Sequence, residues 1–355
     1  WEHTKAVWTA RISRCATLLA AGGFDMALSL YSCKTYQLLQ KISYPPVGGP
    51  AFIWSCDWSG DGEHLLVGCW NSRAYLYEVD RGLASSPMAT KASWTAGKAA
   101  VALMAGPKMG GGGEQAGSAP EPLTEIATVQ RSDRVYAVAL DAMGRALVIG
   151  GRDKKLARFD LQTSDGSVKL RWEVTAEDFI YAVAASPLMH HVACGGPFKA
   201  VLLLDGRNGV QIAKLHFPGV IWAVTLAELP TGPVLAVGGE CPVITVLDIE
   251  TQSDVLQMPV SETTFDICVT TDSLCFTEGK DMGIFGSISR YGWRDHPAFE
   301  VISSVMISLL SSEDQLLRCM RLILGANPAV VNSRSPVTGS TLVHFAVHNS
   351  SNTHL

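Results

Sequence analysis

Only a few side chains in this 355-residue sequence have the types and spacing that chemistry requires. His190 and His191 could bind a metal ion, but they fall in an expected turn between two strands with no carboxylate at ligand spacing, which favours a solvated turn. The glycine-rich segment 108–122 lacks the Gly-x-x-x-x-Gly-Lys-Ser/Thr pattern of a phosphate-binding loop. Zinc-protease and serine-hydrolase patterns are absent as well. The sequence therefore predicts no catalytic residue, no metal site and no cofactor.

A cluster of basic residues surrounds Asp153 in a short stretch of the chain. Its members are Arg152, Lys154, Lys155 and Arg158. Such a cluster either contacts a phosphate group or an acidic peptide, or it forms a solvated turn between two strands. The solvated turn is the plainer interpretation.

A set of aromatic residues is the third candidate, because it recurs at a regular spacing. Each aromatic follows a β-branched residue and precedes small or apolar residues, as in Val135-Tyr136-Ala137-Val138. The six positions are Trp8, Trp54, Tyr136, Tyr181, Trp222 and Phe265. Successive positions are 41 to 46 residues apart, except for a gap of 82 between the second and the third. Fixed spacing of this kind indicates an internal repeat.

The elements that would position these aromatics are short strands. Each aromatic is followed by an apolar run that closes on glycine: Leu18–Gly23, Leu65–Gly68, Leu147–Gly151, Val192–Gly196, Val234–Gly239 and Leu274–Gly279. A third run and a looser fourth strand follow, as at Val201–Leu204 and Gln211–Phe217, and Ile284–Phe285 is the third run of the last unit. Because the runs are continuously apolar, the strands should be covered on both faces. Radial stacking of four-stranded sheets achieves this.

The repeat resembles the WD-repeat β-propeller family over residues 1–286. The resemblance rests on the period, on the Gly-Gly after the second strand and on the endings Tyr77-Glu78 and Phe159-Asp160. Glu2-His3 is similar to the family's Gly-His dipeptide, but no other unit has it and none has Trp-Asp. The resemblance implies a mainly β fold, a WD-repeat β-propeller with six recognisable blades or seven. We expect divergent blades that are held mainly by apolar packing.

Residues 83–127 fill the one long gap between aromatics. Trp94 lies about one period from both neighbouring aromatics, which is typical of a degenerate seventh blade. The segment 108–122 is too rich in glycine and proline for a good strand, which favours an insertion between blades two and three. Both interpretations stay open.

The pattern becomes helical toward the C-terminus. Glu313–Leu324 has apolar residues at helical spacing, and Gly325–Pro328 would end that helix. Gly339–Ala346 resembles the start of an ankyrin repeat. We therefore expect a connector at 287–312 and a short α-helical segment of partial ankyrin repeats at 313–355. Because the chain starts at Trp1 without methionine and ends within this motif, we expect it to be a fragment.

Composition bounds the class of protein. Only 17% of residues are charged, the net charge is −5 and the pI is about 6.0, so no nucleic-acid partner is expected. No apolar run reaches the roughly 20 residues of a membrane span. The nine cysteines form no Cys-x-x-Cys pair, and most lie in apolar runs, which indicates reduced thiols and an intracellular, cytoplasmic location.

The resemblance also implies a function. In WD-repeat propellers the innermost strand starts beside the mouth of the central channel, where partner proteins commonly dock. The six aromatics either form such a protein-binding surface or simply pack between blades, and the second interpretation is the plainer one. We expect a non-catalytic scaffold that binds proteins or peptides through propeller and ankyrin surfaces. The alternative is the cytosolic regulatory portion of a larger multidomain effector, such as an ion channel or a kinase.

Overall fold

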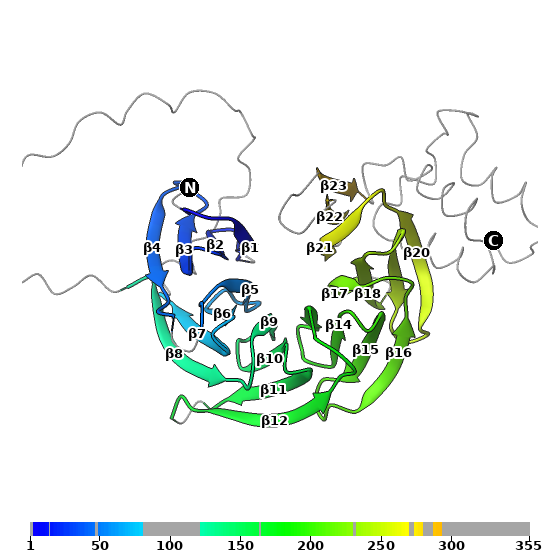
Figure 1. The fold of residues 1–355 in the computed structure, drawn as a ribbon, viewed down its shortest axis with the longest axis horizontal. Helices are drawn as coiled ribbons and strands as arrows, with labels where there is room; N and C mark the ends of the chain where they lie inside the picture. Colours follow the sequence, from blue (N-terminus) through cyan, green and yellow to red (C-terminus); the bar gives the residue numbers. More distant parts are fainter. Residues whose placement is uncertain are drawn as a thin grey trace, which may run out of the picture.

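The computed structural model describes residues 3–13, 15–46, 49–80, 121–162, 165–229, 232–269, 273–279 and 287–292. All regular structure in these ranges is β-strand, arranged as six antiparallel sheets around a common centre (Figure 1). No helix that could cross a membrane occurs among them. The chain is thus mainly β and propeller-like where it is described.

Each sheet is built from strands that follow one another in the chain. The first sheet contains β1 (Val7–Ile12), β2 (Leu18–Gly23), β3 (Ala27–Ser32) and β4 (Leu38–Ser43). The second contains β5 (Ile53–Trp58), β6 (His64–Cys69), β7 (Arg73–Val79) and β8 (Leu123–Gln130). The third contains β9 (Val135–Leu140), β10 (Ala146–Gly151), β11 (Lys155–Leu161) and β12 (Val168–Thr175).

The remaining three sheets repeat this order. The fourth contains β13 (Ala182–Ala185), β14 (His191–Gly195), β15 (Ala200–Asp205) and β16 (Gln211–His216). The fifth contains β17 (Ile221–Leu229), β18 (Gly232–Gly239), β19 (Val243–Asp248) and β20 (Ser253–Pro259). The sixth contains β21 (Thr263–Val269), β22 (Ser273–Gly279) and β23 (Ser287–Gly292).

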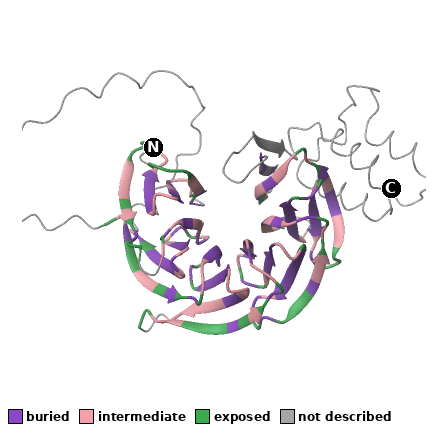
Figure 2. Cartoon of the chain, viewed as in Figure 1, coloured by how far each residue is buried: buried purple, intermediate pink, exposed green. Residues whose placement is uncertain are grey.

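The first strand of each sheet lies innermost, and the innermost strands pack against one another in chain order (Figure 1). Inner strands such as β9 and β10 are buried along their whole length, whereas the outermost strand β12 is largely exposed and β4 is partly exposed (Figure 2). The prediction that the apolar runs are strands covered on both faces is confirmed. Arg11 of β1 and Asp266 of β21 form a two-pronged ion pair that joins the first sheet to the sixth.

The recurring glycines mark places where neighbouring sheets come close. A Cβ atom on Gly22 would lie 2.5 Å from Cγ2 of Ile53, which begins the innermost strand of the next sheet. A Cβ atom on Gly23 would lie 2.1 Å from the carbonyl oxygen of Ala6. Side chains of the next sheet crowd Gly68, Gly150, Gly195 and Gly238 in the same way as Gly22. The β-branched residue and the glycine of the repeat are therefore the two sides of one contact between successive sheets.

The structure corrects the prediction for residues 83–127. Residues 123–127 belong to β8, which pairs with β7 as the fourth strand of the second sheet. The second and third sheets pack directly, since Val135 lies against Gly68, so no blade stands between them. Residues 81–120 lie outside the described ranges and connect β7 to β8 of one sheet. The repeat period could not show this, because it locates the start of each unit but not where an insertion enters it.

The end of the sheet region also lies further along the chain than predicted. Residues 287–292, the expected start of the connector, form β23 and pair with β22. This strand carries two serines and an arginine among six residues, so it lacks the apolar run that marked the other strands. The predicted third run at 284–285, the rest of the connector and the predicted ankyrin segment 313–355 lie outside the described residues.

Polar pairs tie the chain leading into β1 and β9 to the neighbouring turns, although mainly apolar packing was expected. His3 Nδ1 lies 2.8 Å from Asp25 Oδ2, and the two side chains are 3% and 4% exposed. Arg131 precedes Val135 by four residues, as His3 precedes Val7, and its Nη2 atom lies 2.9 Å from Asp153 Oδ2. The divergent units thus keep this tie in at least the first and third sheets, with arginine standing in for histidine.

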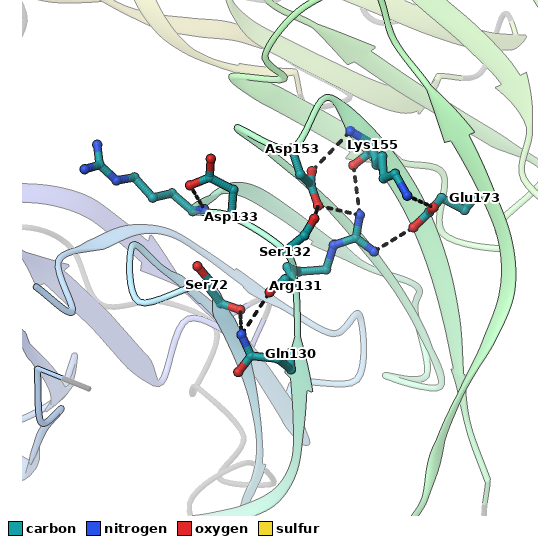
Figure 3. Close-up of polar contacts among 9 residues, drawn as sticks. Ser72, Gln130, Arg131, Ser132, Asp133, Asp153, Lys155 and Glu173 are labelled. Atoms are coloured by element: carbon teal, nitrogen blue, oxygen red, sulfur yellow. Dashed lines mark hydrogen bonds and ion pairs between the residues drawn. The ribbon is translucent and has the colours of Figure 1, made fainter. Parts of the chain in front are cut away.

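The tie in the third sheet is part of a larger polar network (Figure 3). Arg131 Nη1 donates to Glu173 Oε2 at 3.0 Å, and Lys155 Nζ donates to Glu173 Oε1 at 2.7 Å. Ser132 Oγ donates to Asp153 Oδ2 at 3.2 Å. The hydrogen bond from Lys155, followed by that from Arg131, lowers the pKa of Glu173. A buried arginine requires such partners to offset the loss of water.

Candidate functional site

A β-bulge positions the predicted aromatics at the start of the innermost strands. In the second sheet Ile53 pairs with Cys69 and Ser55 pairs with Gly68, so Trp54 has no partner in the ladder. The same irregularity occurs at Trp8, Tyr136, Trp222 and Phe265. A bulged residue is left unpaired and the strand bends at that point. The aromatic is therefore displaced from the regular alternation, while its β-branched neighbour packs between the sheets.

The six predicted aromatics form a continuous row from the first sheet to the sixth. The ring centroids of successive members are separated by 4.2 Å (Trp8–Trp54), 5.4 Å (Trp54–Tyr136), 5.6 Å (Tyr136–Tyr181), 4.5 Å (Tyr181–Trp222) and 6.0 Å (Trp222–Phe265). Five of the residues are partly exposed and Tyr136 is buried. The structure therefore brings all the predicted site residues together, and they pack on one another across the sheet boundaries.

Four further aromatics, which the sequence analysis did not single out, lie against this row. They are Phe24, Phe52, Trp70 and Phe179, and all are partly exposed. A signal for them was present, because Phe24 and Trp70 directly follow the second strand of a sheet, and Phe52 and Phe179 directly precede the β-branched residue of the repeat. We call the ten rings together the aromatic belt.

Three cations lie over rings of the belt. The Cζ atom of Arg134 is 4.3 Å from the ring centroid of Trp70. Arg152 and Lys154 lie over Phe179, at 5.6 and 5.5 Å. Cation–π contacts of this geometry are attractive and orient the cation. The belt thus combines apolar area with fixed positive charge between the second and fourth sheets.

A carboxylate accompanies each of the four basic residues near Asp153. Lys154 Nζ lies 3.0 Å from Asp178 Oδ1, and the hydrogen bond from Lys154 lowers the pKa of that carboxyl. Arg152 Nε lies 3.7 Å from Asp133 Oδ2. The other two ion pairs are Lys155 with Glu173 and Arg158 with Asp160. These pairs favour the interpretation of the cluster as a polar turn over that of a phosphate site.

The belt changes its charge toward the fifth sheet. Trp222 Nε1 donates to Glu240 Oε1 at 3.3 Å, and the indole stacks on Tyr181 with an angle of 3° between the rings. Burial, followed by the neighbouring Tyr136, raises the pKa of Tyr181, so this phenol stays neutral and able to donate a hydrogen bond. The part of the belt between the second and fourth sheets therefore carries the cations, and the part at the fifth sheet carries a carboxylate.

The remaining candidates show no arrangement for chemistry in the described part of the chain. No group of three or more potential metal ligands occurs there. His190 lies in the turn before β14 and His191 is the first residue of that strand, which pairs with β15. Burial, followed by the charge of His190, lowers the pKa of His191. The glycine-rich segment 108–122 lies outside the described residues. The aromatic belt is accordingly the candidate site.

Comparison with known proteins identifies one repeat. The family described as "WD domain, G-beta repeat" matches residues 44–78, which span the segment before β5 and the strands β5, β6 and most of β7. The second sheet therefore contains a WD40 repeat. No curated protein matches the chain.

Proposed function

We propose that the six sheets form a WD-repeat β-propeller that acts as a non-catalytic scaffold and binds partner proteins or peptides through the aromatic belt. The observation that carries the proposal is the continuous row of rings contributed by all six sheets, five of which are partly exposed. The WD40 repeat at residues 44–78 supports it, because WD40 domains typically bind other proteins.

The physical properties of the belt suit protein recognition. Tryptophan and tyrosine are enriched among the few residues that dominate binding energy at protein interfaces, since they bury a large apolar area and keep one polar atom. Here five of the six rings in the row lie at an irregularity of an innermost strand, and all six pack on a neighbouring ring, so little side-chain freedom would be lost on binding. A rigid aromatic surface of this kind binds without any catalytic group.

We also propose an intracellular, cytoplasmic location. Four cysteines are buried without a disulfide: Cys56, Cys69, Cys194 and Cys241. Burial raises the pKa of Cys56 to about 11 and that of Cys194 to about 12, which keeps both thiols protonated and inert. Free buried thiols are typical of proteins from reducing compartments.

The belt is tested by removing two of its rings, in the Trp54→Ala/Trp222→Ala variant. The probe is a random dodecapeptide library displayed on phage and selected against the immobilised 355-residue chain. Peptides selected by the wild type should bind the variant at least about tenfold more weakly, the change that follows from losing about 1.4 kcal/mol at an interface anchor. Circular dichroism establishes that the variant remains folded.

A matched control removes an exposed ring that lies away from the belt. Tyr36, between β3 and β4, is 79% exposed, and Tyr36→Ala should leave peptide binding unchanged. Equal binding by the wild type and the folded belt variant would refute the proposed site.

A further inference from the structure

We propose that Arg134 binds a carboxylate of the partner, so that the belt recognises a polypeptide in which an acidic residue lies among apolar or aromatic ones. The inference rests on the proposed function and adds the chemistry of the partner. It starts from a difference among the three cations that lie over belt rings.

Two of these cations are neutralised within the chain, and the third is not. Arg152 is paired with Asp133 and Lys154 with Asp178. Among the described residues, no carboxylate lies within ion-pair distance of the guanidinium of Arg134. Its charge is balanced only by the π face of Trp70.

The backbone of Arg134 is held in place from both sides. Its N–H donates to Asp133 Oδ1 at 2.7 Å, and its carbonyl oxygen accepts from the N–H of Arg152 at 2.9 Å. The carbonyl oxygen also lies against Gly151, where a Cβ atom would approach to 2.1 Å. The side chain therefore leaves a rigid segment and reaches Trp70 at 4.3 Å. A cation held in this way is pre-organised for a ligand.

A guanidinium that stacks on an aromatic ring keeps the N–H groups at its edge available. Those donors match the two oxygens of a carboxylate, and such paired, charge-assisted hydrogen bonds are the strong ones. Trp70, which Arg134 covers, lies 5.3 Å from Trp54 and 6.1 Å from Tyr136 between ring centroids. A carboxylate bound to Arg134 would therefore have the rings of the belt beside it for the apolar neighbours in the same peptide.

The charges around Arg134 favour a single carboxylate over a polyanion. Asp133, Asp178 and Glu240 lie along the same belt, and the first two already neutralise the neighbouring cations. A nucleic acid needs several phosphate contacts to bind well. One uncompensated arginine among aromatic rings suits one acidic side chain in an apolar segment.

The test uses the same dodecapeptide library with three proteins: the wild type, Arg134→Gln and Arg145→Gln. Arg145 is an exposed arginine in the turn between β9 and β10, away from the belt, and serves as the control. Peptides selected by the wild type and by Arg145→Gln should be enriched in Asp and Glu over the unselected library. Peptides selected by Arg134→Gln should show no such enrichment.

A double-mutant cycle then locates the contact. The strongest wild-type peptide is synthesised with its acidic residue and with the matching amide, and all four combinations with wild type and Arg134→Gln are titrated. The amide should weaken binding to the wild type by about tenfold and should leave binding to Arg134→Gln nearly unchanged. Equal weakening in both proteins, or no acidic enrichment in the wild-type selection, would overturn the proposal.

The outcomes separate this proposal from the function on which it rests. Loss of peptide binding in the Trp54→Ala/Trp222→Ala variant without acidic enrichment would leave the belt intact as a site and refute the role of Arg134. Full binding by the belt variant, or no enriched peptide at all, would refute the proposed function and with it the role of Arg134. A single-stranded oligothymidine that binds the wild type saturably, and does not bind Arg134→Gln, would overturn the proposal of a peptide ligand in favour of a nucleic acid.

Discussion

The third and fourth sheets differ at the place where the chain leading into the innermost strand meets the turn after the second strand. The third sheet has an ion pair at this place, and the fourth sheet has apolar side chains. Arg131 and Asp153 make this contact in the third sheet, with side chains only 6% and 5% exposed. In the fourth sheet, Ala176 takes the place of Arg131, four residues before the β-branched residue, and Phe198 takes the place of Asp153, two residues after the second glycine. Both belong to one apolar cluster.

The backbone is the same in both sheets despite this difference in side chains. Arg131 N–H donates to the carbonyl oxygen of Ser72 at 2.8 Å, and Ala176 N–H donates to that of Lys154 at 2.7 Å. A buried ion pair can be exchanged for apolar groups of similar volume with little loss of stability, whereas removing only one partner is strongly destabilising because the other charge stays buried. The comparison teaches that a repeat can lose its polar signature without losing its geometry.

The largest expected effect comes from removing one member of the charged tie. Arg131→Met leaves the carboxylate of Asp153 buried without its guanidinium partner, which should lower the free energy of unfolding by about 3–5 kcal/mol. Equilibrium unfolding in urea measures the loss. Arg145→Met, at an exposed arginine, should change stability by less than about 0.5 kcal/mol. A loss below about 1 kcal/mol in Arg131→Met would mean that the tie does not hold the third sheet.

A smaller effect is expected when the third sheet receives the apolar pair of the fourth. The double variant Arg131→Ala/Asp153→Phe removes both charges and should be at least about 2 kcal/mol more stable than Arg131→Met in the same urea titration. The reason is that no charge is left buried without a partner. If the double variant is as unstable as the single one, the two ties are not interchangeable and the third sheet needs charge at this position.

The smallest expected effect is a difference in acid sensitivity around the charged tie. Hydrogen bonds from Lys155 and Arg131 hold the pKa of Glu173 below its usual value. The stabilisation is therefore fully present above the unfolded-state pKa of a glutamate, about 4.5, and it is lost as the pH falls through the lower folded-state pKa.

Thermal unfolding between about pH 6 and about pH 3 tests this expectation. Glu173→Gln should have a flatter dependence of Tm on pH than the wild type in that range. Glu250 is exposed in the turn between β19 and β20, so Glu250→Gln serves as the matched control and should follow the wild type. Identical curves for wild type and Glu173→Gln would contradict a role for this carboxyl in the network.

Sequence patterns identified the strands that are apolar along their whole length. The runs ending on glycine became the second strands of the sheets, and in the first five sheets the runs after them became the third strands, because burial on both faces leaves a continuous apolar stretch. Two strands escaped prediction, β8 and β23, in which polar residues alternate with apolar ones or are frequent. Edge positions accept polar side chains, so such strands leave a weaker signal.

The candidate site was predicted in part. The six spaced aromatics were found because the start of the innermost strand, which is irregular in five of the six units, repeats the same residue type along the chain. Phe24, Phe52, Trp70 and Phe179 were missed because the two places that they occupy in the unit hold an aromatic in only two of the six units each, which leaves a weak repeat signal. The position of Arg134 over Trp70 joins residues 64 positions apart in different sheets, and no local pattern encodes it.

By itself, the sequence determined the repeat, the positions of the aromatics and the glycines that close the second strands, because each depends on a few residues in one unit. Only the tertiary structure decided where the insertion enters the second sheet, which basic residues find a carboxylate, and that Arg11 meets Asp266 across 255 positions. These contacts depend on the closure of distant segments around a common centre. A pattern with a period of one unit carries no information about them.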